Sequence, residues 1–104
     1  MAWDGKAPFS KDGKRMFMNV YGRDDSTITW IDVRPLAFTG ALTWTGFRWM
    51  CSGAVADVVD DKGCHYSLSL VDFSRKIPTM VNGRFTGKWE IRKRGTAFLL
   101  SLVE

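Results

Sequence analysis

The chain has 104 residues, a formal net charge of +4 and a hydrophobic content of 45%. That length suits one domain with a modest core, and no stretch has the ~20 consecutive apolar residues that span a bilayer. The first residues also lack the apolar segment of a secretion signal, so we expect a cytoplasmic protein with no membrane partner. Five Trp, seven Phe and two Tyr residues favour a small sheet protein.

Residues 1–14 are rich in Gly, Lys and Asp and predict a loosely ordered leader, which Trp3 and Phe9 could anchor to the core. Residues 15–104 are predicted to form a single β domain. Runs of β-branched and aromatic residues predict its first five strands at 16–21, 27–33, 42–51, 54–59 and 64–70. Pro35 ends the second strand, because proline cannot donate to a strand ladder.

Turn signals separate the later elements. Gly46 predicts a bulge in a long strand, and the loop at 60–63 ends on a glycine suited to a positive φ. Residues 72–80 are the one predicted helical segment, with Asp72 as its cap and Pro78 as its stop. Residues 81–84 contain Asn-Gly, a further turn signal.

The last elements predict a basic β-hairpin with strands at 88–94 and 96–103. If Arg94-Gly95 forms the turn, Ile91 faces Phe98 and Trp89 faces Leu100. These four apolar side chains then share one face, because directly opposed residues lie on the same side of a sheet. Trp89 is therefore predicted to be a core residue.

About six or seven short strands at this spacing, with at most one short helix, predict a mainly β protein. We expect a small antiparallel barrel or sandwich, of the SH3-like or OB-like kind. The sequence does not give the order of the strands.

The two cysteines, Cys51 and Cys64, are predicted to be free thiols, because cytosolic thiols normally stay reduced. If Val59 pairs with Cys64, Cys51 lies opposite Asp72, which also separates the two thiols. A disulfide in an oxidising compartment remains the alternative. A zinc site is disfavoured because the spaced cysteine pairs of such sites are missing, and we predict no metal and no cofactor.

Groups suited to catalysis do not converge. His65 adjoins Cys64, but neighbours on a strand point to opposite faces, so they cannot form a dyad. The paired carboxylates at Asp24-Asp25 and at Asp60-Asp61 lie in turn sequences, where aspartate satisfies the backbone. We find no phosphate-binding glycine motif and no positioned Ser-His-Asp set, so we predict that the protein is not an enzyme.

The charge is concentrated near the end of the chain. Residues 75–94 contain seven cations and one carboxylate, Glu90. The cations are Arg75, Lys76, Arg84, Lys88, Arg92, Lys93 and Arg94. Cations beside aromatic residues are how sheet proteins hold nucleic acid, so these seven are the predicted nucleic-acid-binding residues. The alternative is a solvated edge hairpin whose charges block sheet association.

Tryptophans offer a second kind of contact. Trp44 and Trp49 are the candidate anchors for a protein partner, because tryptophan dominates interface energetics. Trp30, Trp44 and Trp49 also alternate in ways compatible with burial. A ligand pocket inside the barrel and self-association into a homo-oligomer remain open.

Two short segments and the final hairpin carry a resemblance. The run from Gly87 to Phe98 contains a Gly-x-Trp motif, a Lys-Arg-Gly turn and an aromatic strand, and Asp60-Asp61-Lys62-Gly63 and Leu70-Val71-Asp72-Phe73 precede it. In these features the C-terminal half resembles short β-rich proteins encoded by bacteriophages. The resemblance implies a location in the host cytoplasm and a partner that is a host protein or nucleic acid. It assigns no site residues.

The sequence thus favours a small, non-enzymatic protein that contacts nucleic acid through its basic C-terminal hairpin. A protein-interaction module, or an inhibitor of a host protein, is the alternative. Neither the partner nor a preference for DNA or RNA follows from the sequence.

Overall fold

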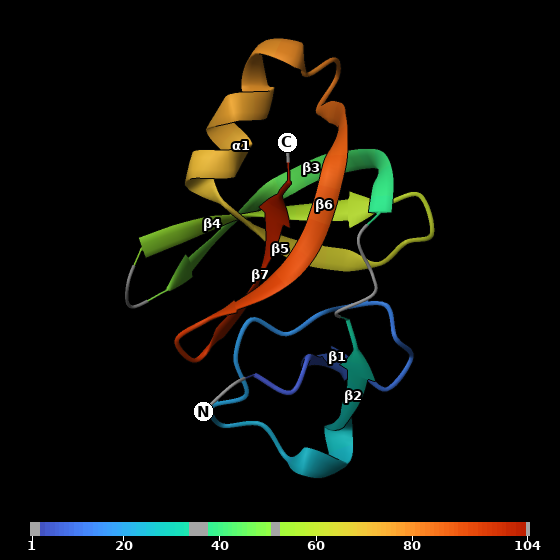
Figure 1. Ribbon diagram of the computed structural model, residues 1–104, viewed down its shortest axis with the longest axis vertical. Coiled ribbons are helices and arrows are strands. Elements are labelled where there is room, and N and C mark those ends of the chain that lie inside the picture. Colours follow the sequence, from blue (N-terminus) through green and yellow to red (C-terminus); the bar gives the residue numbers. More distant parts are fainter. Residues whose placement is uncertain (1–2, 34–37, 51–52, 104) are drawn as a thin grey trace.

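The computed structural model describes residues 3–33, 38–50 and 53–103 (Figure 1). Five strands form a closed barrel: β3 (Phe38–Met50), β4 (Gly53–Asp60), β5 (His65–Ser69), β6 (Arg84–Arg94) and β7 (Ala97–Leu102). Two earlier strands, β1 (Lys6–Ser10) and β2 (Ile28–Asp32), form a separate antiparallel sheet. The prediction of a mainly β protein with a small barrel is confirmed.

The strand order of the barrel is β3-β4-β5-β7-β6, and β3 also pairs with β6 to close it. β5 and β7 run parallel, whereas the other paired strands are antiparallel. This is the order of the five-stranded OB barrel, one of the two predicted kinds. Helix α1 (Leu70–Lys76) lies between β5 and β6 in the chain and at one end of the barrel, and the β1–β2 sheet lies at the opposite end (Figure 1).

Alternation along β6 explains where the core lies. Phe85, Gly87, Trp89 and Ile91 are buried, and the residues between them face outward. Trp89 is fully buried, and its indole Nε1 donates to the carbonyl of Gly40 on β3 at 3.1 Å. Because this donor is satisfied, the indole adds apolar area without an unpaired polar group. Its predicted place in the core is confirmed.

The register of the final hairpin differs from the prediction by two residues. Ile91 pairs with Leu100 and Arg94 with Ala97, so Gly95 and Thr96 form the turn. Gly95 has a φ of 62°, which suits a glycine at the first position of a two-residue hairpin loop. A shift of two keeps every side chain on its face, so the apolar surface was predicted correctly although the pairs were wrong.

The long strand β3 has the predicted bulge, which lies between Trp44 and Gly46. It begins at Phe38, four residues earlier than predicted, because its first half pairs with β6. The predicted pairing of Val59 with Cys64 is wrong, since Val59 pairs with His65.

Cys64 lies in the loop between β4 and β5 because the Asp60 carboxylate organises that loop. Asp60 Oδ1 accepts from the backbone N–H groups of Lys62 and Cys64, both at 2.9 Å. The Cys64 N–H therefore bonds to a side chain rather than to the facing strand, while the Cys64 carbonyl accepts from the N–H of Asp60 at 3.0 Å. Cys64 is free, as predicted, and Cys51 lies outside the described residues.

The helical segment starts earlier than predicted. Ser69, rather than Asp72, caps α1, and its Oγ accepts from the N–H of Asp72 at 3.3 Å. Asp72 is buried in the first turn, and its Oδ2 accepts from the N–H of Leu102, which ties α1 to the end of β7. Pro78 lies in a following 3₁₀ turn (Ile77–Thr79). The predicted turn at 81–84 is present, with Asn82 and Gly83 both at positive φ.

The prediction of a loosely ordered leader over residues 1–14 is wrong at its centre. Residues 6–10 form β1, in which Ala7, Pro8 and Phe9 are buried, and Phe9 belongs to the core cluster. The alternation of buried and exposed residues that marks a half-buried strand is missing there, because both faces of β1 are covered. β2 lies where the second strand was predicted, and Pro35 lies outside the described residues.

The strand predicted at 16–21 is not a regular strand. Its first residues instead lie beside the barrel: the N–H of Met16 donates to the carbonyl of His65 on β5, and the carbonyl of Met18 accepts from the N–H of Phe98 on β7. β5 and β7 pair with each other at Leu68 and Leu100. The segment at 16–18 therefore hydrogen-bonds to backbone groups of β5 and β7 that these two strands do not use to pair with each other.

Candidate nucleic-acid interface

Four of the seven predicted cations share the outer face of β6. Arg84, Lys88, Arg92 and Arg94 are all exposed and lie an even number of residues apart. Side chains two residues apart project from the same side of a strand. At about 3.3 Å per residue they follow a line roughly 33 Å long. We call these four residues the β6 cation row.

Arg84 and Arg92 of this row each contact a carboxylate. Arg84 Nη2 lies 2.9 Å from an Asp61 carboxylate oxygen, and Arg92 pairs with Glu90 on its own strand. The side chains of Arg84, Asp61 and Arg92 are more than half exposed. Exposed ion pairs contribute only about 0–1 kcal/mol, so an incoming phosphate can replace either carboxylate at little cost.

The other three predicted cations lie elsewhere. Arg75 and Lys76 belong to α1, and the side chain of Lys76 lies against the inner side of β6 at Gly87. Lys93 projects to the face opposite the cation row, and its Nζ lies over the ring of Phe98, 5.8 Å from the centroid. The structure thus brings together four of the seven residues.

Lys93 lines a cleft that sequence reasoning missed. The cleft has a volume of about 520 Å³ beside the β6–β7 turn, and Trp3, Lys6, Trp30 and Gly95 also line it. Both indoles contact the Phe98 ring, at centroid distances of 6.4 Å for Trp3 and 6.0 Å for Trp30. Trp30 is 47% exposed, although its strand pattern was compatible with burial. We call this feature the hairpin-tip cleft.

The candidate anchors for a protein partner lie on β3. Trp49 is 85% exposed, whereas Trp44 is 36% exposed and packs against Phe47 and Phe73. Phe47 is itself half exposed. The two predicted residues therefore differ, since Trp49 is open to solvent and Trp44 is largely a packing residue.

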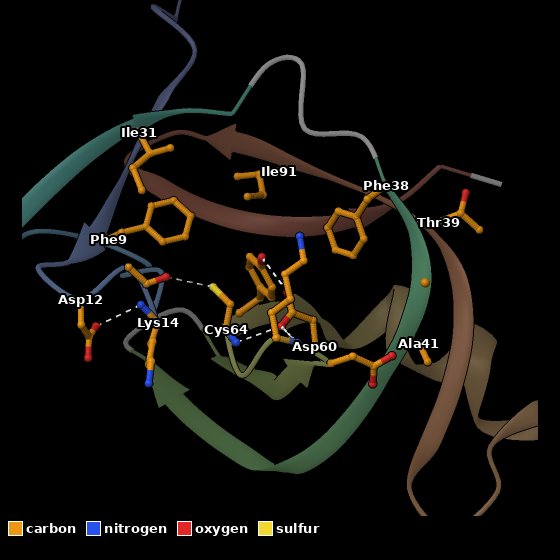
Figure 2. Close-up of a pocket in the computed structure, with 15 residues that line it drawn as sticks. Phe9, Asp12, Lys14, Ile31, Phe38, Thr39, Ala41, Asp60, Cys64 and Ile91 are labelled. Carbon is orange, nitrogen blue, oxygen red and sulfur yellow. Dashed lines mark hydrogen bonds between the residues drawn. The ribbon is translucent and has the colours of Figure 1, made fainter.

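A second pocket lies at the barrel end that faces the small sheet (Figure 2). It has a volume of about 640 Å³, with Phe9 and Ile31 from the small sheet facing Phe38 and Ile91 from the barrel. Asp60 also lines this pocket, and its carboxylate accepts from two backbone N–H groups and from the Tyr66 hydroxyl. The carboxylate is thus already engaged by its own loop and strand.

The Cys64 thiol and the Tyr66 phenol of this pocket stay protonated at neutral pH. Burial, the largest cause, raises the pKa of the Cys64 thiol above its ordinary 9.0 and that of Tyr66 above its ordinary 10.0. The Cys64 thiol also donates to the carbonyl of Gly13 at 3.5 Å. Because the thiolate is the nucleophile, Cys64 is a poor one at this site.

These two raised pKa values predict an alkaline loss of stability. The unfolded chain releases its thiol and phenol protons near their ordinary pKa values, while the folded protein keeps them. The folded state therefore binds more protons, and the free energy of unfolding should fall as the pH rises above 9.0. Each group can contribute up to about 1.4 kcal/mol per pH unit. Urea unfolding in a pH series measures the slope.

A Tyr66→Phe variant serves as the control for this prediction. It lacks the phenol proton, so its stability should fall less steeply above the ordinary tyrosine pKa of 10.0. Equal slopes for the variant and the unchanged protein would contradict a raised Tyr66 pKa.

His65 points away from Cys64, which lies in the loop before β5, as predicted. Its Nδ1 is 3.6 Å from the Asp57 carboxylate, which also lies 3.5 Å from Arg15 and 3.5 Å from Arg48. Cys64 instead points into the barrel-end pocket (Figure 2). The paired aspartates serve turns: Asp24 caps a 3₁₀ turn, and Asp60 organises the β4–β5 loop. Within the described part of the chain, no group of three His, Cys, Asp or Glu side chains is placed to hold a metal ion.

Comparison of the chain with protein-family models, with curated proteins and with solved structures gave no match. A search of the described helices found none with the length and apolar character to cross a membrane.

Proposed function

We propose that this protein is a non-enzymatic nucleic-acid-binding protein that contacts phosphates through the β6 cation row. The observation that carries the proposal is the alignment of Arg84, Lys88, Arg92 and Arg94 on one outer face of one strand. A line of cations is suited to a line of phosphates, which supply much of the affinity in protein–nucleic acid complexes.

Two further features support the proposal. The row ends at the β6–β7 turn, and OB barrels bind oligonucleotides with the corresponding loop. The ion pairs of Arg84 and Arg92 are exposed, so both guanidinium groups remain open to a phosphate. The expected cytoplasmic location, in the host cell if the protein is phage-encoded, places the protein among nucleic acids.

The test is a salt series with fluorescently labelled DNA and RNA strands, from about 50 to 200 mM salt. We expect the logarithm of the binding constant to fall linearly with the logarithm of the salt concentration. In a triple variant with Lys88→Glu, Arg92→Glu and Arg94→Glu, we expect weaker binding. Its slope should be smaller by about two to three, roughly one for each phosphate that the variant no longer binds.

The matched control carries Lys11→Glu, Lys14→Glu and Lys62→Glu. These three lysines are also exposed, so the control has the same net charge as the triple variant and changes a different surface. It should keep nearly the full slope. Equal losses in the two variants would show that only net charge matters, and no binding by the unchanged protein would refute the proposal.

The second candidate function is binding to a protein partner, and the exposure of Trp49 favours it. Trp49 is 85% exposed, and Phe47 on the same strand is 51% exposed. Large exposed aromatic side chains are typical interface anchors. A protein captured from a nuclease-treated host lysate by the unchanged protein, and not by Trp49→Ala, would favour this function over nucleic-acid binding.

A further inference from the structure

We infer that the hairpin-tip cleft holds an unpaired nucleobase, so that the protein selects single strands. This inference rests on the proposed function and deepens it, because it names the kind of nucleic acid. The cation row alone would serve single and double strands alike, since phosphates are common to both.

The cleft combines a flat aromatic surface with positive charge. Trp30 is half exposed, and its ring stands edge-on to the buried Phe98 ring, with an interplanar angle of 72°. Phe98 thereby holds Trp30 in place and leaves much of the indole open to solvent. A base has a π-face that can stack on such a ring whatever its sequence.

Trp3 gives the cleft a second supported indole. Its Nε1 donates to the carbonyl of Lys6 at 2.9 Å, and its ring also contacts Phe98. Both indoles are therefore held before a ligand arrives. Side chains that are already ordered lose less conformational entropy on binding, which favours the complex.

Charge in the cleft matches a nucleotide. The Lys93 ammonium lies over the Phe98 ring, and the exposed Lys6 also lines the cleft, against Asp4 as the one carboxylate among the described residues there. Phosphates on either side of a stacked base would lie near these two ammonium groups. The volume of about 520 Å³ is within the range of sites that bury small ligands.

The position of the cleft connects it to the cation row. Lys93 projects into the cleft, while Arg92 and Arg94, its neighbours on β6, project from the opposite face. A flexible strand that follows the row can turn at the hairpin tip and place one base on Trp30. Bases in a duplex are stacked and paired, so a duplex has none to offer unless it is first unstacked, which costs free energy.

The test compares two probes with the same phosphates. One is an oligothymidylate of about 15 nucleotides, within the range that one OB barrel covers, and the other is an abasic strand of equal length. We expect the protein to bind the oligothymidylate roughly 5- to 150-fold more tightly, the gain typical of one stacked base. Trp30→Leu should lose this preference and keep the affinity and salt slope for the abasic strand.

Leucine is chosen because it retains an apolar contact with Phe98 and removes the flat ring. Trp49→Leu is the matched control, since it removes an exposed indole from another surface, and it should keep the preference. If Trp30→Leu does not fold, NMR of the unchanged protein tests the base site instead, through the indole N–H signal of Trp30. It should shift with oligothymidylate and stay in place with the abasic strand.

Each other outcome has a defined meaning. Equal binding of the two probes overturns the base site and leaves the proposed function standing. A preference that survives Trp30→Leu, or an unshifted Trp30 signal, also overturns the base site. If neither probe binds, the proposed function and the base site both fail.

Discussion

Replacement of Trp89 with alanine is expected to lower the free energy of unfolding by about 3–5 kcal/mol. The indole is fully buried in the barrel, stands edge-on to Phe85 at 5.8 Å and donates to the Gly40 carbonyl. The variant loses the apolar packing, leaves a cavity and removes the partner of a part-buried carbonyl. Since small domains have a total stability of about 5–15 kcal/mol, the loss should be plain in a urea titration.

Trp49→Ala is the control for this prediction. It removes the same side chain from a position that is 85% exposed, so its effect on stability should stay within about 0.5 kcal/mol. Similar losses in the two variants would contradict the closed barrel with Trp89 at its centre.

A comparable loss, about 3–5 kcal/mol, is expected for Phe9→Ala. Phe9 is 4% exposed and belongs to the same core cluster as Trp89, although it comes from a segment that the sequence assigned to a loose leader. The β1–β2 sheet should therefore unfold together with the barrel. Thermal unfolding followed by near-ultraviolet circular dichroism and by far-ultraviolet circular dichroism should give one coincident transition.

Lys11→Ala provides the matched control, because Lys11 lies in the same segment and is exposed. It should leave the transition unchanged. Two separate transitions in the unchanged protein, or a neutral Phe9→Ala, would show that the small sheet is only loosely attached to the barrel.

The barrel could be predicted from the sequence only where the alternation of apolar and polar residues indicates which side chains are buried. β6 alternates without a break from Arg84 to Ile91, so its inner face was identified correctly. The pairing was not, because shifts of two residues leave the alternation the same, and only the turn distinguishes them. Arg94-Gly95 and Gly95-Thr96 are both acceptable turns in sequence, and the glycine at positive φ decides for the second.

Elements whose burial depends on distant partners were not predictable. β1 has three consecutive buried residues because both faces of this strand are covered by distant parts of the chain, and no local pattern reports that. The hairpin-tip cleft was missed for the same reason, since Trp3 and Trp30 meet Phe98 across most of the length of the chain. Lys88 and Arg92 of the β6 cation row, in contrast, lie within one predicted strand and follow from its period of two, whereas Arg84 and Arg94 were assigned to turns.

The segment at 16–18 has a consequence for how the chain is made. The Met18 carbonyl accepts from the N–H of Phe98 on β7, far later in the chain, and the N–H of Met16 donates to the carbonyl of His65 on β5. On the ribosome the Met18 carbonyl has no native partner until β7 has emerged. Contacts so distant in sequence slow folding and leave intermediates exposed. We therefore expect the barrel to close only after β7 has been synthesised, and chains that stop short of β7 not to fold.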